Sequence, residues 1–191
     1  MQHYRFCRIC AGIFYCVIAL IIRFTGKGWL DKALPPVVIG SVIIVIGLGN
    51  SAAIAIDASH KLLRIGHNAF AYTDNHMQMI AAASLREGDV IIGISHSGSS
   101  KDIIEAMKIA RKNGATAISI TNKGHSPIQK FSDIVLCTDS DETQYNILAL
   151  NSRIVQLTIV DALYFYIAFQ QSERSLEHIN ETVMSLKTKK Y

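Results

Sequence analysis

The feature that most constrains the fold is a regular alternation of short, β-rich apolar runs with longer helical stretches, which begins near residue 41. The first run, Val42–Ile46, is continuously apolar and ends in glycine, as is typical of a strand buried on both faces of a parallel sheet. Further strands are expected over Ala69–Tyr72, Val90–Ile94, Thr116–Thr121 and Ile134–Thr138. Five strands separated by helices predict a doubly wound α/β fold, with right-handed crossovers that place helices on both faces of the sheet.

Three helical stretches follow the first three strands, and two more close the chain. Helices are expected over Ser51–Ile65, Asn75–Leu85, Asp102–Lys112, about 146–169 and about 176–187. The 146–169 helix is apolar nearly all round, so it must bury more than one face, and a subunit interface would do this. Gln156 and Asp161 within it argue against a membrane span.

The composition is that of a compact globular protein. Half of the 191 residues are hydrophobic and 18% are charged, which excludes a disordered chain. The net charge of +4 resides in residues 1–40, which hold five Lys or Arg against one acid, whereas residues 41–172 hold ten against eleven. Because the main body lacks a basic stripe, we expect no nucleic-acid binding through this chain alone. The chain divides into an apolar and basic leader over 1–40, one domain over 41–172 and a C-terminal helix over 173–191.

The leader holds an unusual apolar segment. Ile9–Ile22 are fourteen uncharged, mostly apolar residues between basic flanks. A membrane span needs roughly twenty such residues, and no clear cleavage site for a signal peptide follows. Three interpretations stay open: a membrane anchor or uncleaved signal, a helix that packs on the body or on a partner, or the leader of a truncated gene.

The cysteines indicate neither disulfides nor a metal site. Three of the four lie in the leader, and Cys7-x-x-Cys10 lacks the second ligand pair that zinc requires. His60, His67 and His76 also lack the spacing of metal ligands, so we expect them to pack or to face solvent. A reducing cytoplasm fits this pattern, with no metal and no cofactor.

Two loops at the carboxyl ends of predicted strands carry residues suited to an anion. In Gly47–Ser51, glycines let the backbone approach a ligand, and the following helix offers free N–H groups. The second loop, Ser95–Ser100, presents four hydroxyls and also precedes a helix. Ligands of open α/β sheets lie where the strand order reverses, so a 2-1-3-4-5 order would turn both loops toward one crevice. A phosphomonoester that bridges the loops is the simplest interpretation.

Other readings of these loops stay open. The pattern Gly47-x-Gly49-x-x-Ala52, with Asp74 after the second strand, matches a dinucleotide-binding motif and favours a nucleotide ligand. Serine hydroxyls, however, suit a compact phosphomonoester better than an extended pyrophosphate. Ser99 with Asp102 three residues later also predicts a capping box, which would give Ser99 a structural role.

The stretch from about Val42 to Ala168 resembles a SIS (sugar isomerase) domain, most closely the effector domain of MurR/RpiR-type transcriptional regulators. The resemblance is carried by GLGNSAAIAIDASHKLLRIG (47–66), DNHMQMIAAASLREGDVIIGISHSGSSKDI (74–103), AISITNKGHSPIQKFSDIVL (117–136) and NSRIVQLTIVDALYFYIA (151–168). It implies that Ser51, Ser95, Ser97 and Ser100 contact a sugar phosphate. It also implies homodimers or homotetramers built partly on the long helix. Such regulators carry an N-terminal helix-turn-helix domain, for which residues 1–40 are too few and too apolar.

The leading hypothesis is therefore a non-catalytic sensor of a phosphorylated sugar. The predicted ligand-binding residues are Gly49, Asn50, Ser51, Ser95, His96, Ser97, Gly98, Ser99, Ser100, Thr121 and Glu142. The alternative is an aldose–ketose phosphosugar isomerase, in which Glu142 or His96 would serve as the general base. Lys61 and Arg64 are expected to be surface or interface charges, and Arg153 is given no role.

Overall fold

The computed structural model of the chain describes residues 42–139 and 150–187. Its sheet has five parallel strands in the order β2-β1-β3-β4-β5, which confirms the predicted fold class and strand order. The strands are β1 (Ile43–Gly47), β2 (Ala69–Tyr72), β3 (Val90–Ile94), β4 (Thr116–Asn122) and β5 (Ile134–Thr138). Each strand lies within about a residue of its predicted bounds.

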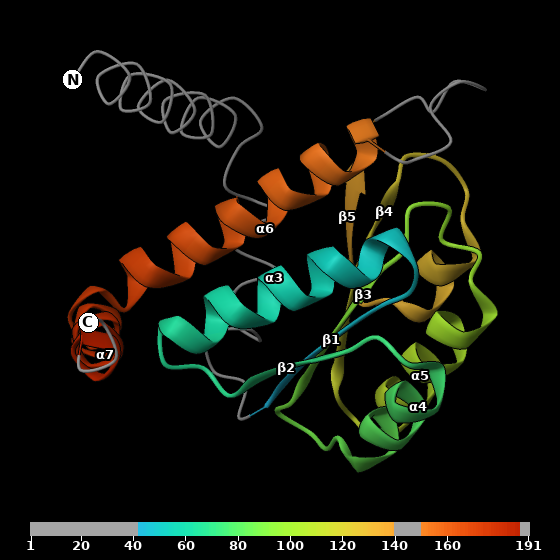
Figure 1. Ribbon diagram of the computed structural model, residues 1–191. Coiled ribbons are helices and arrows are strands. Elements are labelled where there is room, and N and C mark those ends of the chain that lie inside the picture. Colours follow the sequence, from blue (N-terminus) through green and yellow to red (C-terminus); the bar gives the residue numbers. More distant parts are fainter. Residues whose placement is uncertain (1–41, 140–149, 188–191) are drawn as a thin grey trace.

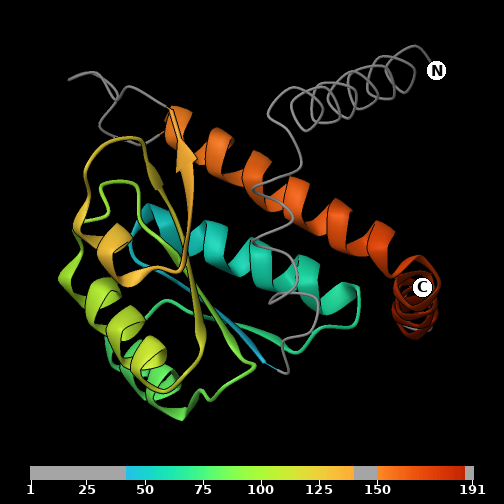
Figure 2. The ribbon, with the colours of Figure 1, turned by 180° about the vertical axis from the view of Figure 1, so that it is seen from behind.

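The helices cover both faces of this sheet. They are α3 (Asn50–Arg64), α4 (Asn75–Ser84), α5 (Lys101–Lys112), α6 (Leu150–Gln170) and α7 (Ser172–Lys187), with a short 3₁₀ helix η1 (Pro127–Phe131) before β5. Figures 1 and 2 show α3 and α6 on one face of the sheet and α4 and α5 on the other. The sequence did not predict η1, because a single 3₁₀ turn leaves no periodic pattern.

Alternate side chains of each strand enter two separate cores. In β1, Ile43 and Val45 pack with α3 and α6, whereas Ile44 and Ile46 pack with α4 and α5. All five residues of β1 are buried, as are all five of β3. The sheet is therefore covered on both sides, as the continuous apolar runs predicted.

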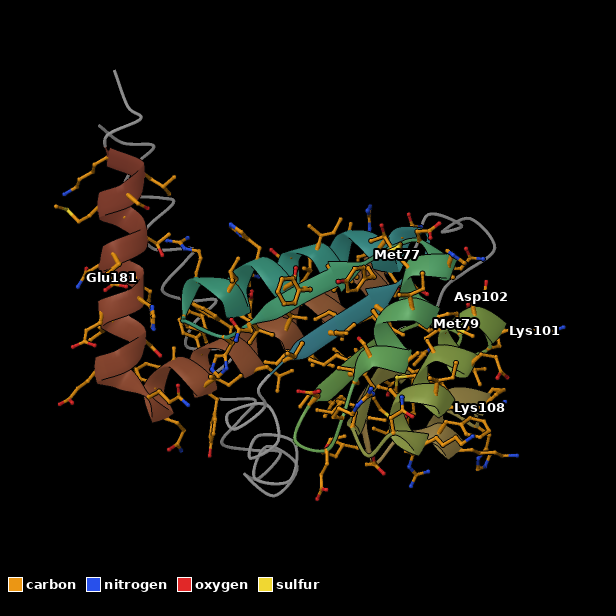
Figure 3. All side chains as sticks on the ribbon, turned by 90° about the horizontal axis from the view of Figure 1, so that it is seen from below. Met77, Met79, Lys101, Asp102, Lys108 and Glu181 are labelled. Carbon is orange, nitrogen blue, oxygen red and sulfur yellow. The ribbon has the colours of Figure 1, made fainter. Side chains whose placement is uncertain are left out.

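The two C-terminal helices are joined at Gln171 and run in different directions (Figure 1). The predicted start of the long helix at residues 146–149 lies outside the described residues, and α7 begins at Ser172, four residues before its predicted start. Among the described helices, α6 is long and apolar enough to cross a membrane by length and composition. However, Val160, Leu163 and Ile167 of α6 are buried in the core beside α3. Helix α7, on which Glu181 is labelled, projects from the body (Figure 3).

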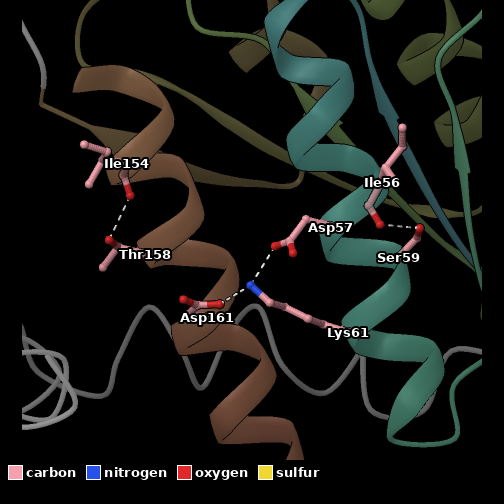
Figure 4. A network of polar contacts seen from close by, with 7 residues as sticks. All are labelled: Ile56, Asp57, Ser59, Lys61, Ile154, Thr158 and Asp161. Atoms are coloured by element: carbon pink, nitrogen blue, oxygen red, sulfur yellow. Dashed lines mark hydrogen bonds and ion pairs between the residues drawn. The ribbon is translucent and has the colours of Figure 1, made fainter. Parts of the chain in front are cut away.

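A three-charge contact fastens α3 to α6. The Lys61 ammonium donates to the Asp57 carboxylate at 2.6 Å within α3 and to the Asp161 carboxylate of α6 (Figure 4). All three side chains are partly buried. Lys61 was expected to be a surface or interface charge, but here it joins two helices of the same core, and we call this contact the Lys61 latch.

Loss of the Lys61 ammonium is expected to destabilise the fold in a pH-dependent manner. The pKa of Lys61 is raised above its ordinary 10.5, because hydrogen bonds and charge attraction from Asp161 and Asp57 outweigh the lowering caused by burial. A raised lysine pKa contributes stability that is complete below pH 10.5 and is lost as the pH rises through the folded-state pKa.

We therefore expect Lys61→Met to lower the free energy of unfolding by about 1–2 kcal/mol near neutral pH, measured by urea denaturation. The difference from wild type should shrink in strongly alkaline buffer. Lys123→Met is the control, because Lys123 forms an exposed pair with Asp139. An equal loss in both variants, or a difference that does not change with pH, would contradict the latch.

Candidate functional site

The two predicted loops meet at one edge of the sheet. Gly47, the last residue of β1, is paired with Ile94, the last residue of β3, so the chain leaves both strands at the same level. A cleft of about 350 Å³ opens there, near the lower end of the roughly 300–1,000 Å³ typical of ligand pockets. Its lining residues are Leu48, Asn50, Ser51, Ser95, His96, Ser97, Ser100, Ser152, Arg153 and Gln156.

The loop Ser95–Ser100, hereafter the serine loop, is held to β4 through its main chain. The Ser95 N–H donates to the Ile120 carbonyl at 3.0 Å, and the Asn122 N–H donates to the His96 carbonyl at 2.9 Å. The buried Thr121 hydroxyl donates to the same His96 carbonyl at 3.2 Å. Thr121, predicted as a ligand contact, therefore supports the loop from behind.

Helix η1 holds the middle of the serine loop. The Ile128 N–H donates to the Gly98 carbonyl at 3.0 Å. Gly98 has φ +58°, and a Cβ there would lie 2.7 Å from the Thr121 hydroxyl oxygen and closer still to the Ser126 side chain. Only glycine fits this position without displacing its neighbours, so the SHSGSS spacing has a local structural cause.

Because main-chain bonds shape the loop, two of its four hydroxyls, those of Ser95 and Ser100, remain available. In the part of the chain that the structure describes, the hydroxyls of Ser51, Ser95 and Ser100 make no hydrogen bond, although Ser100 is the N-cap residue of α5. The Ser97 and Ser99 hydroxyls lie 2.8 Å apart. Three uncommitted hydroxyls around one cleft indicate a ligand rich in hydrogen-bond acceptors.

The predicted capping box at Ser99 is wrong. Helix α5 begins one residue later than that motif requires, with Ser100 as its N-cap residue. Asp102 is then the second residue of the helix rather than the third, so it cannot complete the reciprocal pair. Ser99 is exposed at the rim, where its hydroxyl meets Ser97.

Helices α3 and α5 both begin at the cleft and turn their positive ends toward it. Their first N–H groups have no partner within the helix, so an anion is favoured at this position. Among the described lining residues none is acidic, and Arg153 alone carries a permanent positive charge. The cleft therefore has a positive potential.

The start of α6 forms the far wall of the cleft, which the sequence analysis missed. Ser152, Arg153 and Gln156 all line it. Gln156 is only 1% exposed, and its amide nitrogen is buried without a hydrogen-bond partner among the described residues. The spacing of 153 and 156 places two polar side chains on one face of an otherwise apolar helix, and that signal was present in the sequence.

The remaining predicted residues have distinct positions. Gly49 precedes α3 with φ +56° and, like Gly98, shapes its loop rather than lining the cleft. Glu142 lies outside the described residues. Asp74 caps α4, where its carboxylate accepts the Met77 N–H at 3.0 Å. This local contact gives Asp74 a structural role that does not need the ribose of a dinucleotide.

The histidines that were not assigned to the site pack or face solvent as expected. His67 is buried, whereas His60 and His76 are exposed. Within residues 42–139 and 150–187, no group of three His, Cys, Asp or Glu side chains is arranged to hold a metal ion.

Comparison with known proteins now identifies the family. Residues 41–166 match the SIS domain, and the chain belongs to this family. It is 40% identical over 136 residues to the HTH-type transcriptional regulator RpiR of Escherichia coli (strain K12), a match covering 71% of this chain and 46% of RpiR. It is 39% identical over 157 residues to an uncharacterized HTH-type regulator of Caldanaerobacter subterraneus subsp. tengcongensis, covering 81% of this chain and 56% of that protein. The chain thus spans about half the length of these curated relatives.

Solved structures share the fold. The Vibrio vulnificus NanR protein complexed with ManNAc-6P has a TM-score of 0.81 at 24% identity, covering 95% of this chain and 70% of NanR. The sugar isomerase domain of an RpiR transcription factor from Sphaerobacter thermophilus has a TM-score of 0.75 at 25% identity, covering 83% of this chain and 87% of that domain.

Proposed function

We propose that this SIS domain binds a phosphorylated sugar as the sensor domain of an RpiR-type transcriptional regulator. The observation that carries the proposal is the cleft itself: uncommitted serine hydroxyls and two helix N-termini surround a space that no acidic side chain of residues 42–139 or 150–187 lines. The sequence relatives support the regulatory role, since RpiR of E. coli is a transcriptional regulator. NanR, which has the same fold, was solved with ManNAc-6P.

The phosphate group would occupy the serine loop at the start of α5. A phosphate dianion there accepts hydrogen bonds from Ser95, Ser97 and Ser100 and from the first N–H groups of the helix. The sugar ring then extends toward Ser51 and α6. His96 also lines the cleft and would border the ring.

A sensor is preferred over an isomerase because the sequence relatives are transcriptional regulators. Binding of the sugar phosphate would change the arrangement of the subunits. The domain would work in the cytoplasm, where gene regulators act.

Loss of one phosphate donor should weaken binding without harming the fold. We expect Ser97→Ala to reduce the affinity for the best-bound aldose or ketose phosphate of a panel by roughly tenfold or more, because hydrogen bonds to charged groups are strong. Isothermal titration calorimetry measures this change. Ser84→Ala is the matched control, since the Ser84 hydroxyl donates to the Ala81 carbonyl in α4, away from the cleft. Unchanged affinity in Ser97→Ala, or interconversion of the sugars at an enzymatic rate, would count against a sensor of this design.

The assembly proposed for the chain is a homodimer or homotetramer built on α6 and α7. Large apolar side chains remain uncovered along both helices: Ile154 is 63% exposed, Phe169 77%, Leu176 59% and Met184 61%. Burying such side chains against a second copy would remove their apolar surface from water. Each fully buried side chain would stabilise the assembly by up to about 1.5–3 kcal/mol.

A charge placed on this surface should separate the subunits. We expect Phe169→Glu to shift the protein toward monomers in sedimentation velocity experiments, because a carboxylate cannot be buried without a partner. Phe70→Glu is the control, since Phe70 lies on the edge strand β2 and is 49% exposed. A wild-type protein that is monomeric at high concentration would overturn the proposed assembly.

A further inference from the structure

The far wall of the cleft presents donors that the phosphate does not need. Arg153 and Gln156 stand three residues apart on α6, so they share one face of the helix. The phosphate site on the serine loop already has three hydroxyls and the N-terminus of α5. The α6 donors therefore face the part of the ligand that lies beyond its phosphate.

Arg153 has no counter-charge within the described part of the chain. It also borders a shallow groove between α3 and α6 together with Asp57. That carboxylate, however, is bonded to Lys61, which also holds Asp161. Both acids are thus paired with Lys61, and among the described residues Arg153 forms no ion pair with either, so its guanidinium remains available for a ligand.

Gln156 also needs a hydrogen-bond acceptor from a ligand. Its amide nitrogen is buried and lacks a hydrogen-bond partner in residues 42–139 and 150–187, which is costly until an acceptor arrives. The guanidinium of Arg153 and the amide N–H of Gln156 together present several hydrogen-bond donors on one wall of the cleft. A neutral hydroxyl can accept one or two of these hydrogen bonds but carries no charge, whereas a carboxylate carries a negative charge and offers two oxygens that match the fork of an arginine.

We propose that Arg153 and Gln156 are specificity-determining residues that bind a carboxylate, so the preferred ligand is a phosphorylated sugar acid rather than a neutral sugar phosphate. This inference rests on the proposed function. One end of the ligand is the phosphate on the serine loop, and the other is the acid group on α6. The ligand would then connect the β3–α5 loop to the helix that leads into α7.

The test compares two probes with the same six-carbon chain: 6-phosphogluconate, which ends in a carboxylate, and glucitol 6-phosphate, which ends in an alcohol. We expect the wild-type protein to bind the acid about tenfold tighter or more in isothermal titration calorimetry. Arg153→Met should abolish this preference, because it should lower the affinity for 6-phosphogluconate about tenfold more than the affinity for glucitol 6-phosphate. Arg64→Met, at the opposite end of α3, is the matched control and should leave the preference intact.

Gln156→Glu gives a second test in case Arg153→Met fails to fold. The new carboxylate has nearly the same shape but repels a second carboxylate, so 6-phosphogluconate should lose most of its advantage over glucitol 6-phosphate. Equal binding of the two probes to wild type would overturn the inference and leave the proposed function standing. A loss in Arg153→Met that is equal for both probes would assign Arg153 to the phosphate and would also overturn it. If inorganic phosphate and every sugar phosphate fail to bind, the proposed function itself fails.

Discussion

The main-chain hydrogen bonds that fix the serine loop are the interaction on which the rest of the site depends. The end of β4 and the start of η1 supply donors to the carbonyls of His96 and Gly98, and the loop needs no hydroxyl of Ser95 or Ser100 to keep its shape. Those hydroxyls can then face the cleft without internal partners. A preorganised set of donors avoids the entropy that a flexible loop would lose on binding.

The two helices that line the cleft share a second contact farther along. Helices α3 and α6 both start at the cleft, and the Lys61 latch joins them about two turns or more beyond it. This contact fixes the position of α6 relative to the sheet, and with it the wall formed by Arg153 and Gln156. Anything that pulls this wall toward the serine loop therefore also acts on α6, which continues after one residue into α7. The fold in this way connects the proposed ligand site to the helices that carry the exposed apolar side chains.

Much of the fold and one side of the site could be predicted from the sequence, and the physical reasons are clear. The continuous apolar runs of β1 and β3 indicate burial on both faces, and the strand order then brings Ser51 and the serine loop together. The α6 wall was missed because the spacing of Arg153 and Gln156 marks a polar face of the helix but does not show which part of the sheet that face packs beside. For Thr121, the position at a strand end was predictable, but the direction of its hydroxyl toward the His96 carbonyl was not.

The central claim is that the serine loop and the N-terminus of α5 hold a phosphate group. A crystal structure of the protein grown with a bound sugar phosphate tests this most directly. The account predicts phosphate oxygens within hydrogen-bond distance of the Ser95, Ser97 or Ser100 hydroxyls and of the first N–H groups of α5. A structure with the sugar phosphate bound elsewhere, and with the cleft filled only by water, would contradict it.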